Sequence, residues 1–509
     1  MEAPRYYLTT PIYYVNDVPH IGHAYTTLAC DVLARFMRLD GCDVLFLTGT
    51  DEHGQKVEKA AKTRKMEPQA FTDKVSKNFR DLLPFMNISN DDFIRTTEAR
   101  HKVSAQAIWR RLMQNGHIYL DKYSGWYSVR DEAYFAENEL IDGKAPTGAP
   151  VEWVEEPSYF FDLSKWQTKL LEFYNENPNF IAPASRRNEV ISFVSSGLRD
   201  LSISRTSFNW GIAVPDDEKH IMYVWLDALT NYITATGFPN EQETLYKKFW
   251  PASLHMVGKD ILRFHAVYWP AFLLAAGLEP PKRVFAHGWW TNEGQKISKS
   301  LGNVIDPIEL VEKYGLDQVR YFLLREVPFG NDGDFSKNSM INRINSDLSN
   351  DLGNLCQRVL SFVQKNCDAS IPQNNGFSND DERLIAQVYG VLPSLRADFN
   401  SQSFNVALER IWSIVSASNK YIDEQAPWKL RKTEPERMQT VLFTLLETIR
   451  CIGIVLQPVM PASANEILNQ LTIDPSDRSF SALNEEHCLQ SGAKLQQPNP
   501  IFPRFDEKT

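Results

Sequence analysis

The chain has 509 residues, of which 43% are hydrophobic and 23% charged, and its formal net charge at pH 7 is −10. That length is too great for one ordinary hydrophobic core, so we expect two to four domains of a soluble globular protein. The acidic balance excludes a globally positive surface, and a nucleic-acid partner would have to be bound by local basic patches.

We expect that no apolar run is long enough by composition to span a membrane, and we expect no signal or transit segment, because the sequence starts with a strand-like stretch. The six cysteines are nowhere spaced as Cys-x-x-Cys, which argues against a zinc ribbon and against a disulfide framework. The composition therefore predicts a cytoplasmic protein with no membrane association and no metal site.

The first stretch of interest joins a predicted strand to a predicted helix. Arg5 to Ile12 is rich in Tyr, Thr and Leu, as strands are, and apolar residues recur with helical spacing after His23. His20, Gly22 and His23 occupy the turn between them. A helix start offers free N–H groups to anions, the glycine lets a ligand approach, and two imidazoles add donors. The turn suits phosphate binding; the alternative is a pair of surface histidines without a ligand.

A second buried strand is predicted at Asp43 to Thr48, and the polar loop after it contains Asp51. Strand, helix and strand in succession indicate a parallel α/β sheet. Ligands bind beyond the C-terminal ends of such strands, where both the histidine turn and Asp51 are predicted to lie. The alternative for Asp51 is a helix N-cap.

The character of the sequence changes between residues 115 and 215, where aromatic residues crowd together and a Pro/Gly-rich loop occurs. We interpret this segment as an insertion between two halves of a nucleotide-binding domain. The α/β pattern returns at Ile221 to Trp225, Ser253 to Val257 and Arg283 to Phe285, which predicts three further strands of the same sheet.

Two lysines then follow three residues apart, Lys296 and Lys299, among small hydroxyl residues. They could neutralise a polyphosphate as it gains charge, although a solvated basic loop is the commoner fate of such a stretch. Beyond about Ser336, two apolar stripes of helical period predict a helix bundle. We expect the polar tail after Pro475 to fold back over the body.

Together, His20-Ile21-Gly22-His23 and Lys296-Ile297-Ser298-Lys299-Ser300 resemble the paired signatures of class I aminoacyl-tRNA synthetases. The surrounding residues narrow the resemblance, over nearly the whole chain, to the methionyl-tRNA synthetase family. It implies a Rossmann-type catalytic domain, split by an insertion that closes over the tRNA acceptor end, and an all-α anticodon-binding bundle. The implied domains are 1–114 and 216–290 (catalytic), 115–215 (insertion), 291–335 (linking region) and 336–509 (helical).

The resemblance implies that methionine and ATP, with Mg²⁺, form methionyl-adenylate and pyrophosphate, after which methionine passes to tRNA(Met), including the initiator. In many relatives the insertion carries zinc knuckles; here it has no cysteine, so we expect no zinc. The implied catalytic residues are His20, His23, Lys296 and Lys299. The implied ATP-binding residues are these four with Gly22, Gly258, Asp260 and Ser298.

The implied methionine-binding residues are Ile12, Tyr14, Asp51, Trp225, Ala228, Leu229, Tyr232 and His287. Asp51 would bind the ammonium group, and an aromatic and aliphatic wall suits a flexible thioether. Some relatives have proline where this chain has Leu229. The alternative for Trp225 and Tyr232 is that they are ordinary core aromatics.

In the helical region, Asn354, Arg358, Pro427 and Trp428 match family positions that read the CAU anticodon. An unstacked base needs an aromatic platform and a hydrogen-bonding edge, and Lys429, Arg431 and Lys432 could contact phosphates. The alternative is that Trp428 caps a helix junction.

Competing interpretations remain within and outside the class. Synthetases for Ile, Leu or Val need a larger editing insertion, and one for cysteine needs a metal site. A non-catalytic tRNA-binding relative would not need the intact histidine and lysine signatures. Simple adenylyltransferases share the histidine turn but lack the long helical region. Without an appended dimerising domain, we expect a monomer.

Overall fold

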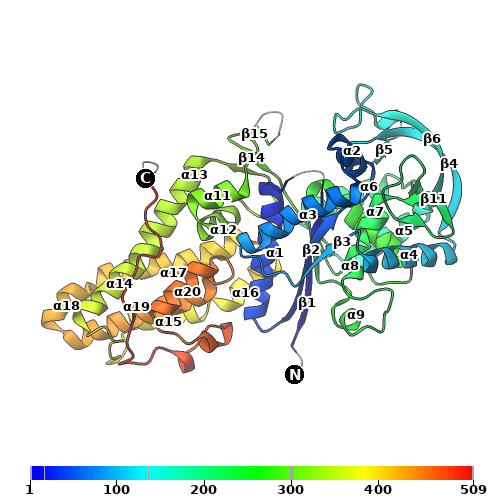
Figure 1. Ribbon diagram of the computed structural model, residues 1–509. Coiled ribbons are helices and arrows are strands. Elements are labelled where there is room, and N and C mark those ends of the chain that lie inside the picture. The colour runs from blue at the N-terminus through cyan, green and yellow to red at the C-terminus, as the bar shows by residue number, and fades with distance from the viewer. Residues whose placement is uncertain (1–2, 16–17, 132, 136, 298–302, 507–509) are drawn as a thin grey trace. The chain divides into compact units, whose positions relative to one another are not determined.

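The computed structural model describes residues 3–15, 18–131, 133–135, 137–297 and 303–506 (Figure 1). The chain forms two compact units, neither of them contiguous in sequence. One, the sheet unit, contains Arg5–Pro19 and Val44–His287. The other, the helical unit, contains Met1–Pro4, His20–Asp43 and Gly288–Thr509.

A six-stranded sheet in the order β3-β2-β1-β12-β13-β7 forms the centre of the sheet unit. β1 with β12, β12 with β13, β13 with β7, and β2 with β3 are parallel pairs, which confirms the predicted α/β class. The strands are β1 (Arg5–Tyr14), β2 (Asp43–Asp51), β3 (Asp92–Arg95), β7 (Ile181–Ala182), β12 (Leu254–Gly258) and β13 (Val284–His287).

The prediction that Ile221 to Trp225 adds a strand to this sheet is wrong. β11 (Asp217–Met222) belongs to a small antiparallel sheet with β9 (Ser204–Arg205) and β10 (Ala213–Val214), and α7 (Val224–Leu229) begins directly afterwards. A short apolar run does not distinguish a buried strand from the start of a buried helix. Two strands of the sheet were also not predicted from the sequence, the four-residue β3 and the two-residue β7, and β7 is too short to leave a pattern in the sequence.

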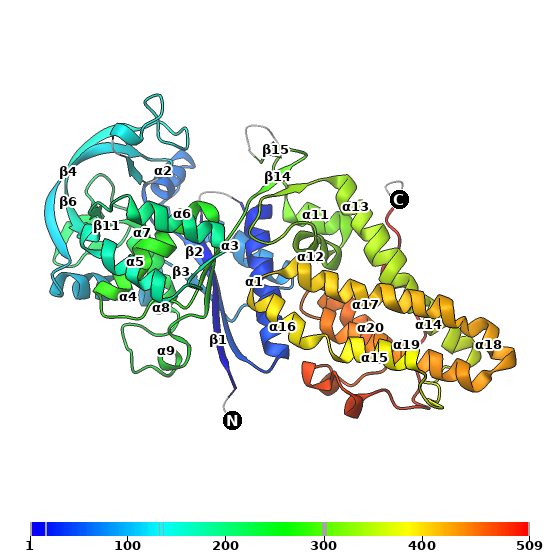
Figure 2. The ribbon, with the colours of Figure 1, turned by 180° about the vertical axis from the view of Figure 1, so that it is seen from behind.

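Much of the segment predicted as an insertion folds into a separate antiparallel sheet in the order β5-β4-β6-β8, seen at the edge of Figure 2. Its aromatic residues form cross-strand pairs, such as Tyr119 stacked on Phe160 with ring centroids 5.7 Å apart. The domain boundaries themselves stay a prediction. The strands are β4 (Ile118–Ser128), β5 (Ala133–Phe135), β6 (Glu152–Phe161) and β8 (Leu201–Ser202).

Helices pack on the six-stranded sheet through two buried clusters. Tyr7 of β1 shares the larger cluster with Trp109 and Trp269, and Tyr13 near the far end of β1 shares the smaller one with Phe71. The helices of the sheet unit, besides α7, are α2 (Gln55–Thr63), α3 (Pro68–Phe85), α4 (Ala99–Gln114), α5 (Gln167–Glu176), α6 (Ala184–Ser195), α8 (Asn231–Thr234), α9 (Thr244–Phe249) and α10 (Trp269–Ala275).

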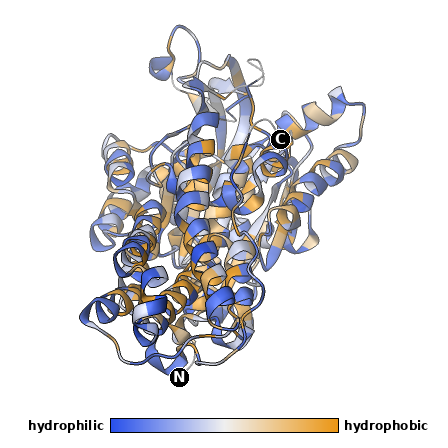
Figure 3. Ribbon diagram, turned by 90° about the vertical axis from the view of Figure 1, so that its left-hand side faces the viewer, coloured by the Kyte–Doolittle hydropathy of each residue, from blue (hydrophilic) through white to orange (hydrophobic). Residues whose placement is uncertain are grey.

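The helical unit contains the predicted bundle, and both predicted apolar stripes are buried in it, one in α17 and one in α19. In Figure 3, helices carry both hydrophobic (orange) and hydrophilic (blue) residues, as expected of helices with one buried and one exposed face. The helices are α1 (Ile21–Leu39), α11 (Pro307–Tyr314), α12 (Leu316–Arg325), α13 (Lys337–Arg343), α14 (Asn354–Asn366), α15 (Asn379–Tyr389), α16 (Leu392–Asn400), α17 (Phe404–Gln425), α18 (Pro427–Thr433), α19 (Pro435–Leu456) and α20 (Pro461–Gln470).

A buried ion pair joins α1 to the rest of the helical unit. Arg320 of α12 donates from Nη2 to Asp31 Oδ2 of α1 at 2.6 Å, and both side chains are fully buried. The same guanidinium donates to the carbonyls of Pro458 and Val459, between α19 and α20. Breaking such a pair leaves an uncompensated buried charge, so α1 is held firmly.

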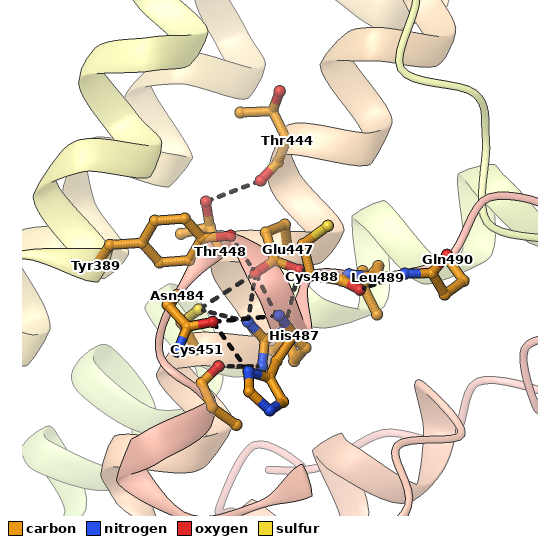
Figure 4. A network of polar contacts seen from close by, with 12 residues as sticks. Tyr389, Thr444, Glu447, Thr448, Cys451, Asn484, His487, Cys488, Leu489 and Gln490 are labelled. Carbon is orange, nitrogen blue, oxygen red and sulfur yellow. Dashed lines mark hydrogen bonds and ion pairs between the residues drawn. The ribbon is translucent and has the colours of Figure 1, made fainter.

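The tail after α20 folds back on the helical unit, as predicted. Glu447 of α19 accepts the backbone N–H of Leu489 at 3.0 Å and the hydroxyl of Tyr389 at 2.8 Å (Figure 4). Its buried partner Arg450 donates to the carbonyl of Ala482 at 2.9 Å. The tail thus satisfies polar groups that α19 buries, which is a structural role.

One helix differs from the expectation that no apolar run reaches membrane-spanning length. α19, with 22 residues, is long and apolar enough by composition to cross a membrane. However, 94% of its apolar window is buried inside the protein, as in the central helix of a bundle.

Candidate active site

The histidine turn caps the start of α1. His20 is the N-cap residue, and its Nδ1 accepts the backbone N–H of Gly22 at 3.0 Å. The backbone N–H of His20 in turn donates to His23 Nδ1 at 3.1 Å, which completes a capping box built from two imidazoles. Since each Nδ1 accepts, the proton of each neutral ring lies on Nε2, and these N–H groups are suited to donate to an anion.

Two further features fit this turn to a phosphate. A Cβ on Gly22 would lie 2.9 Å from His20 Cε1, so a larger residue would displace the imidazole. Burial, and then repulsion from His20, lowers the pKa of His23 well below its ordinary value. His23 is therefore neutral at pH 7, so it can donate a hydrogen bond from Nε2 but carries no charge.

The segment 296–300, here called the lysine loop, begins at the end of a tight hairpin in the helical unit. β14 (Trp290–Asn292) and β15 (Gln295–Lys296) pair around Glu293 and Gly294, whose φ angles of 49° and 76° are those of a type I′ turn. Ser298 and Lys299 lie outside the described residues. The sequence predicts Lys296 on a loop, whereas the structure places its backbone at the end of strand β15, paired with Thr291.

Both flanks of the lysine loop contact α1. The rings of Trp290 and Tyr25 are perpendicular, with centroids 5.5 Å apart, and Ile21 donates its backbone N–H to the carbonyl of Ile305 at 3.2 Å. The described residues on both sides of the lysine loop, far from the histidine turn in sequence, therefore contact the first turns of α1.

In the sheet unit, predicted residues gather at the C-terminal ends of four strands. Ile12 and Tyr14 end β1, Asp51 ends β2, Gly258 ends β12 and His287 ends β13. Gly258 lies opposite His287 in the parallel register. This edge of a parallel sheet is where ligands bind. Asp51 is not a helix N-cap, because it belongs to β2 and the cap of α2 is Gly54.

Gly258 has a steric reason to be glycine. A Cβ there would lie 2.5 Å from Asp260 Oδ1, so any side chain would force the carboxylate away. Gly258 and Asp260, predicted to lie near adenosine, are thus packed together at the C-terminal end of β12.

Trp225, Ala228 and Leu229 lie on α7 and Tyr232 lies on α8, and all four are buried. The Trp225 ring stacks on Phe264, with centroids 3.7 Å apart and planes 7° apart. The Tyr232 hydroxyl lies 2.7 Å from His265 Nε2. The alternative that Trp225 and Tyr232 are core aromatics is thus right about their burial. A methionine pocket at this place must therefore lie beside these buried rings.

Phe264 and His265 were not predicted from the sequence. They lie on the π-helical turn Phe264–Tyr268, and such turns are frequent at functional sites. The only signal that could have found them is their position shortly after the strand end at Gly258.

The hydrogen bonds of His265 determine its tautomer. Its Nδ1 lies 2.9 Å from the carbonyl of Ile261, which can only accept, so Nδ1 carries the proton. Nε2 must then accept the hydroxyl proton of Tyr232. Burial lowers the pKa of His265 to about 4, which keeps this arrangement neutral at physiological pH.

We expect a pH-dependent loss of stability from this histidine. In the unfolded chain it titrates near 6.5, so its contribution is complete above that pH and is lost as the pH falls towards about 4. At pH 5 the loss from this group alone is about 2 kcal/mol. Thermal unfolding of the wild type and His265→Gln at pH 7 and pH 5 measures it. The variant should lose less stability on acidification; an equal loss would contradict the assignment.

A second group of predicted residues lies on α14 and α18 of the helical unit. Arg358 Cζ lies 5.7 Å from the ring centroid of Trp428, and Arg358 Nη2 donates to Asp423 Oδ1 at 2.6 Å. Trp428 is 44% exposed and Asn354 is exposed, whereas Pro427 is buried as the first residue of α18. An exposed indole beside a guanidinium offers a base both a platform and a hydrogen-bonding edge.

Comparison with known proteins identifies the family. A family model described as "tRNA synthetases class I (M)" matches residues 6–152 and 138–360, and another, "Anticodon binding domain of methionyl tRNA ligase", matches residues 371–509. The methionine–tRNA ligase of Rickettsia felis is 60% identical, over 98% of both chains. This chain belongs to the methionyl-tRNA synthetase family.

Other members agree over the full length. The methionine–tRNA ligase of Rhizobium meliloti is 54% identical over 99% of both chains. The Mycobacterium tuberculosis methionyl-tRNA synthetase in complex with methionyl-adenylate is 52% identical, with a TM-score of 0.96 over 98% of this chain and 100% of that one. Its apo form has a TM-score of 0.89.

The resemblance, the fold class and the enzyme class predicted from the sequence are thus confirmed. The chain is a class I synthetase that uses ATP, a ligase of methionine and tRNA, with an anticodon-binding domain. Among the residues that the structure describes, no cluster of three or more His, Cys, Asp or Glu is arranged to hold a metal ion. The expectation of no zinc stays a prediction.

Proposed function

We propose that this synthetase forms methionyl-adenylate with the residues at the start of α1 and the lysine loop acting on ATP, and with the strand ends and α7 binding methionine. The observation that carries the proposal is the contact of both flanks of the lysine loop with α1, at Tyr25 and Ile21. That arrangement supports a single phosphate site made from two separate signatures.

The proposed chemistry is an in-line attack of the methionine carboxylate on the α-phosphorus of ATP. His20 and His23 donate Nε2–H groups to the phosphates, and Gly22 leaves room for them. Lys296, Ser298 and Lys299 bind the β- and γ-phosphates, and the lysines neutralise charge as pyrophosphate leaves. Gly258 and Asp260 hold the adenosine. The protein positions groups and stabilises charge, and it forms no covalent bond itself.

Mg²⁺ is proposed to travel with ATP. Its ligands are then mainly phosphate oxygens and water, as is usual for this ion in nucleotide sites. The turn of His20 to His23 fits this arrangement, because it offers N–H donors to phosphate oxygens and no carboxylate that would compete for them.

For methionine, Asp51 is proposed to bind the ammonium group, and Ile12, Tyr14, Ala228 and Leu229 to line the side chain. Trp225 and Tyr232 form the aromatic wall. The stack of Trp225 on Phe264 and the hydrogen bond from Tyr232 to His265 support adding Phe264 and His265 to the wall. A polarizable thioether packs well against such rings. His287 stays a proposed contact at the end of β13.

The second step transfers methionine to the CCA end of tRNA(Met), including the initiator. Asn354, Arg358, Pro427 and Trp428 are proposed to read the CAU anticodon, with Trp428 as the stacking platform. We further propose a cytoplasmic monomer without zinc and without membrane association.

ATP–pyrophosphate exchange, run with each of the twenty amino acids, tests the proposed function. Methionine should support exchange, its close isosteres only weakly, and isoleucine and leucine hardly at all. A hydrophobic pocket alone discriminates one methylene by only about 10–200-fold, so the thioether contacts must supply the rest. Equal exchange with isoleucine or leucine would refute the proposed pocket.

A further inference from the structure

A buried carboxylate lies on α7 between two proposed methionine-binding residues. Asp227 follows Trp225 by two positions and precedes Ala228, and it is fully buried. Its Oδ2 lies 2.7 Å from His53 Nδ1 and its Oδ1 lies 2.7 Å from His101 Nε2. Each carboxylate oxygen thus has one imidazole partner, and all three side chains are buried.

The hydrogen bonds of this cluster have a definite direction. Burial alone would raise the pKa of Asp227, but attraction to His53 and hydrogen bonds from His101 and His53 together outweigh it and lower the pKa to about 2, so the carboxylate is ionised. An ionised carboxylate can only accept hydrogen bonds. His53 therefore carries its shared proton on Nδ1, and His101 on Nε2. These charge-assisted bonds are about twice as strong as neutral ones.

The other end of the cluster lies beside Asp51. His53 comes two residues after Asp51, at the end of β2, and His101 lies on α4. Glu52, which lies between Asp51 and His53 in the sequence, accepts two hydrogen bonds from Arg95, at 2.7 and 2.9 Å. The residues that follow Asp51 are thus anchored twice, by Glu52 to the neighbouring strand β3 and by His53 to α7.

We propose that Asp227 is a positioning residue for methionine: through His53 it holds α7, which carries Trp225 and Ala228, in register with the strand end that carries Asp51. His101 supports it from α4. The three residues form a clamp that sets the distance between the group binding the ammonium and the wall binding the side chain. The inference rests on the proposed roles of Asp51 and Trp225.

Asp227→Asn is the principal test, with ATP–pyrophosphate exchange as the assay. The amide keeps the size of the side chain but turns an N–H₂ group towards one of the imidazole donors. The KM for methionine should rise about tenfold or more. The KM for ATP should change by less than about twofold, because the proposed ATP contacts lie on other segments. An unchanged methionine KM would overturn the proposal.

Two substitutions of His53 test whether its hydrogen bond to Asp227, and not its size, supports methionine binding. His53→Asn retains an N–H donor close to the place of Nδ1, whereas His53→Ala removes it. We expect the methionine KM to rise for alanine and to stay near the wild-type value for asparagine. Equal values for the two variants would overturn the clamp. This pair decides the question if Asp227→Asn does not fold.

Asp381→Asn is the matched control. Asp381 is another fully buried carboxylate, which accepts hydrogen bonds from Tyr421 and Arg437 in the helical unit. Its substitution should lower the melting temperature and leave the methionine KM unchanged. If it raised the methionine KM as much as Asp227→Asn does, the effect would be general destabilisation and the proposal would fail.

Trp225→Ala distinguishes failure of the clamp from failure of the proposed function. If this variant leaves the methionine KM unchanged, the methionine pocket has been assigned wrongly, and the clamp falls with it. If Trp225→Ala raises the methionine KM while Asp227→Asn and His53→Ala do not, the pocket stands and the clamp alone is refuted.

Discussion

Lys299→Ala should slow methionyl-adenylate formation by about two to three orders of magnitude while leaving methionine binding almost unchanged. The proposed target of the lysine is negative charge that develops on the phosphates as pyrophosphate leaves. A contact that strengthens only in the transition state affects turnover more than ground-state affinity. Pre-steady-state measurement of adenylate formation, with separate titration of methionine, gives both quantities.

Lys313→Ala provides the matched control for this variant. Lys313 is an exposed lysine on α11, the first helix after the lysine loop, and its ammonium lies over the ring of Tyr314. Its loss should change neither turnover nor methionine affinity appreciably. A Lys299→Ala enzyme with normal turnover and a raised methionine KM would show that the lysine loop has been assigned to the wrong substrate.

Local patterns in the sequence were sufficient to predict the elements that carry the signatures. The histidine turn at the start of α1 was predictable because capping and helical periodicity involve neighbours in sequence. β7 was not, because its two residues pair with β13 about a hundred residues later. Ile221 to Trp225 was misread because burial, and not secondary structure, sets the composition of so short a run.

The candidate site shows the same division between local and distant information. Asp51, Gly258 and His287 could be placed at strand ends from local pattern. His265 acquires its role only through Tyr232, and the partner of His53 is Asp227, which lies 174 residues away along the chain. A buried histidine has no distinctive neighbours in sequence, so tertiary packing alone reveals such residues.

Trp428→Ala should separate the two half-reactions of the enzyme. Aminoacylation of tRNA with a CAU anticodon should fall by about 10–100-fold, as the loss of one base-stacking contact implies. ATP–pyrophosphate exchange without tRNA should stay near normal, because the anticodon of a tRNA lies far from its acceptor end. Both activities, measured on the same preparation, give the comparison.

Thermal unfolding distinguishes two roles for Trp428: stacking on the anticodon, or packing at a helix junction. A tryptophan that caps a helix junction should be buried, and its removal should lower the melting temperature and both activities together. Trp428 is instead 44% exposed, with Arg358 over its ring, so truncation should leave thermal unfolding nearly unchanged. A tRNA with an altered anticodon serves as the control, because the variant should no longer prefer CAU strongly over it. If the preference survives intact, or if aminoacylation falls only in step with unfolding, the base is read elsewhere on the helical unit.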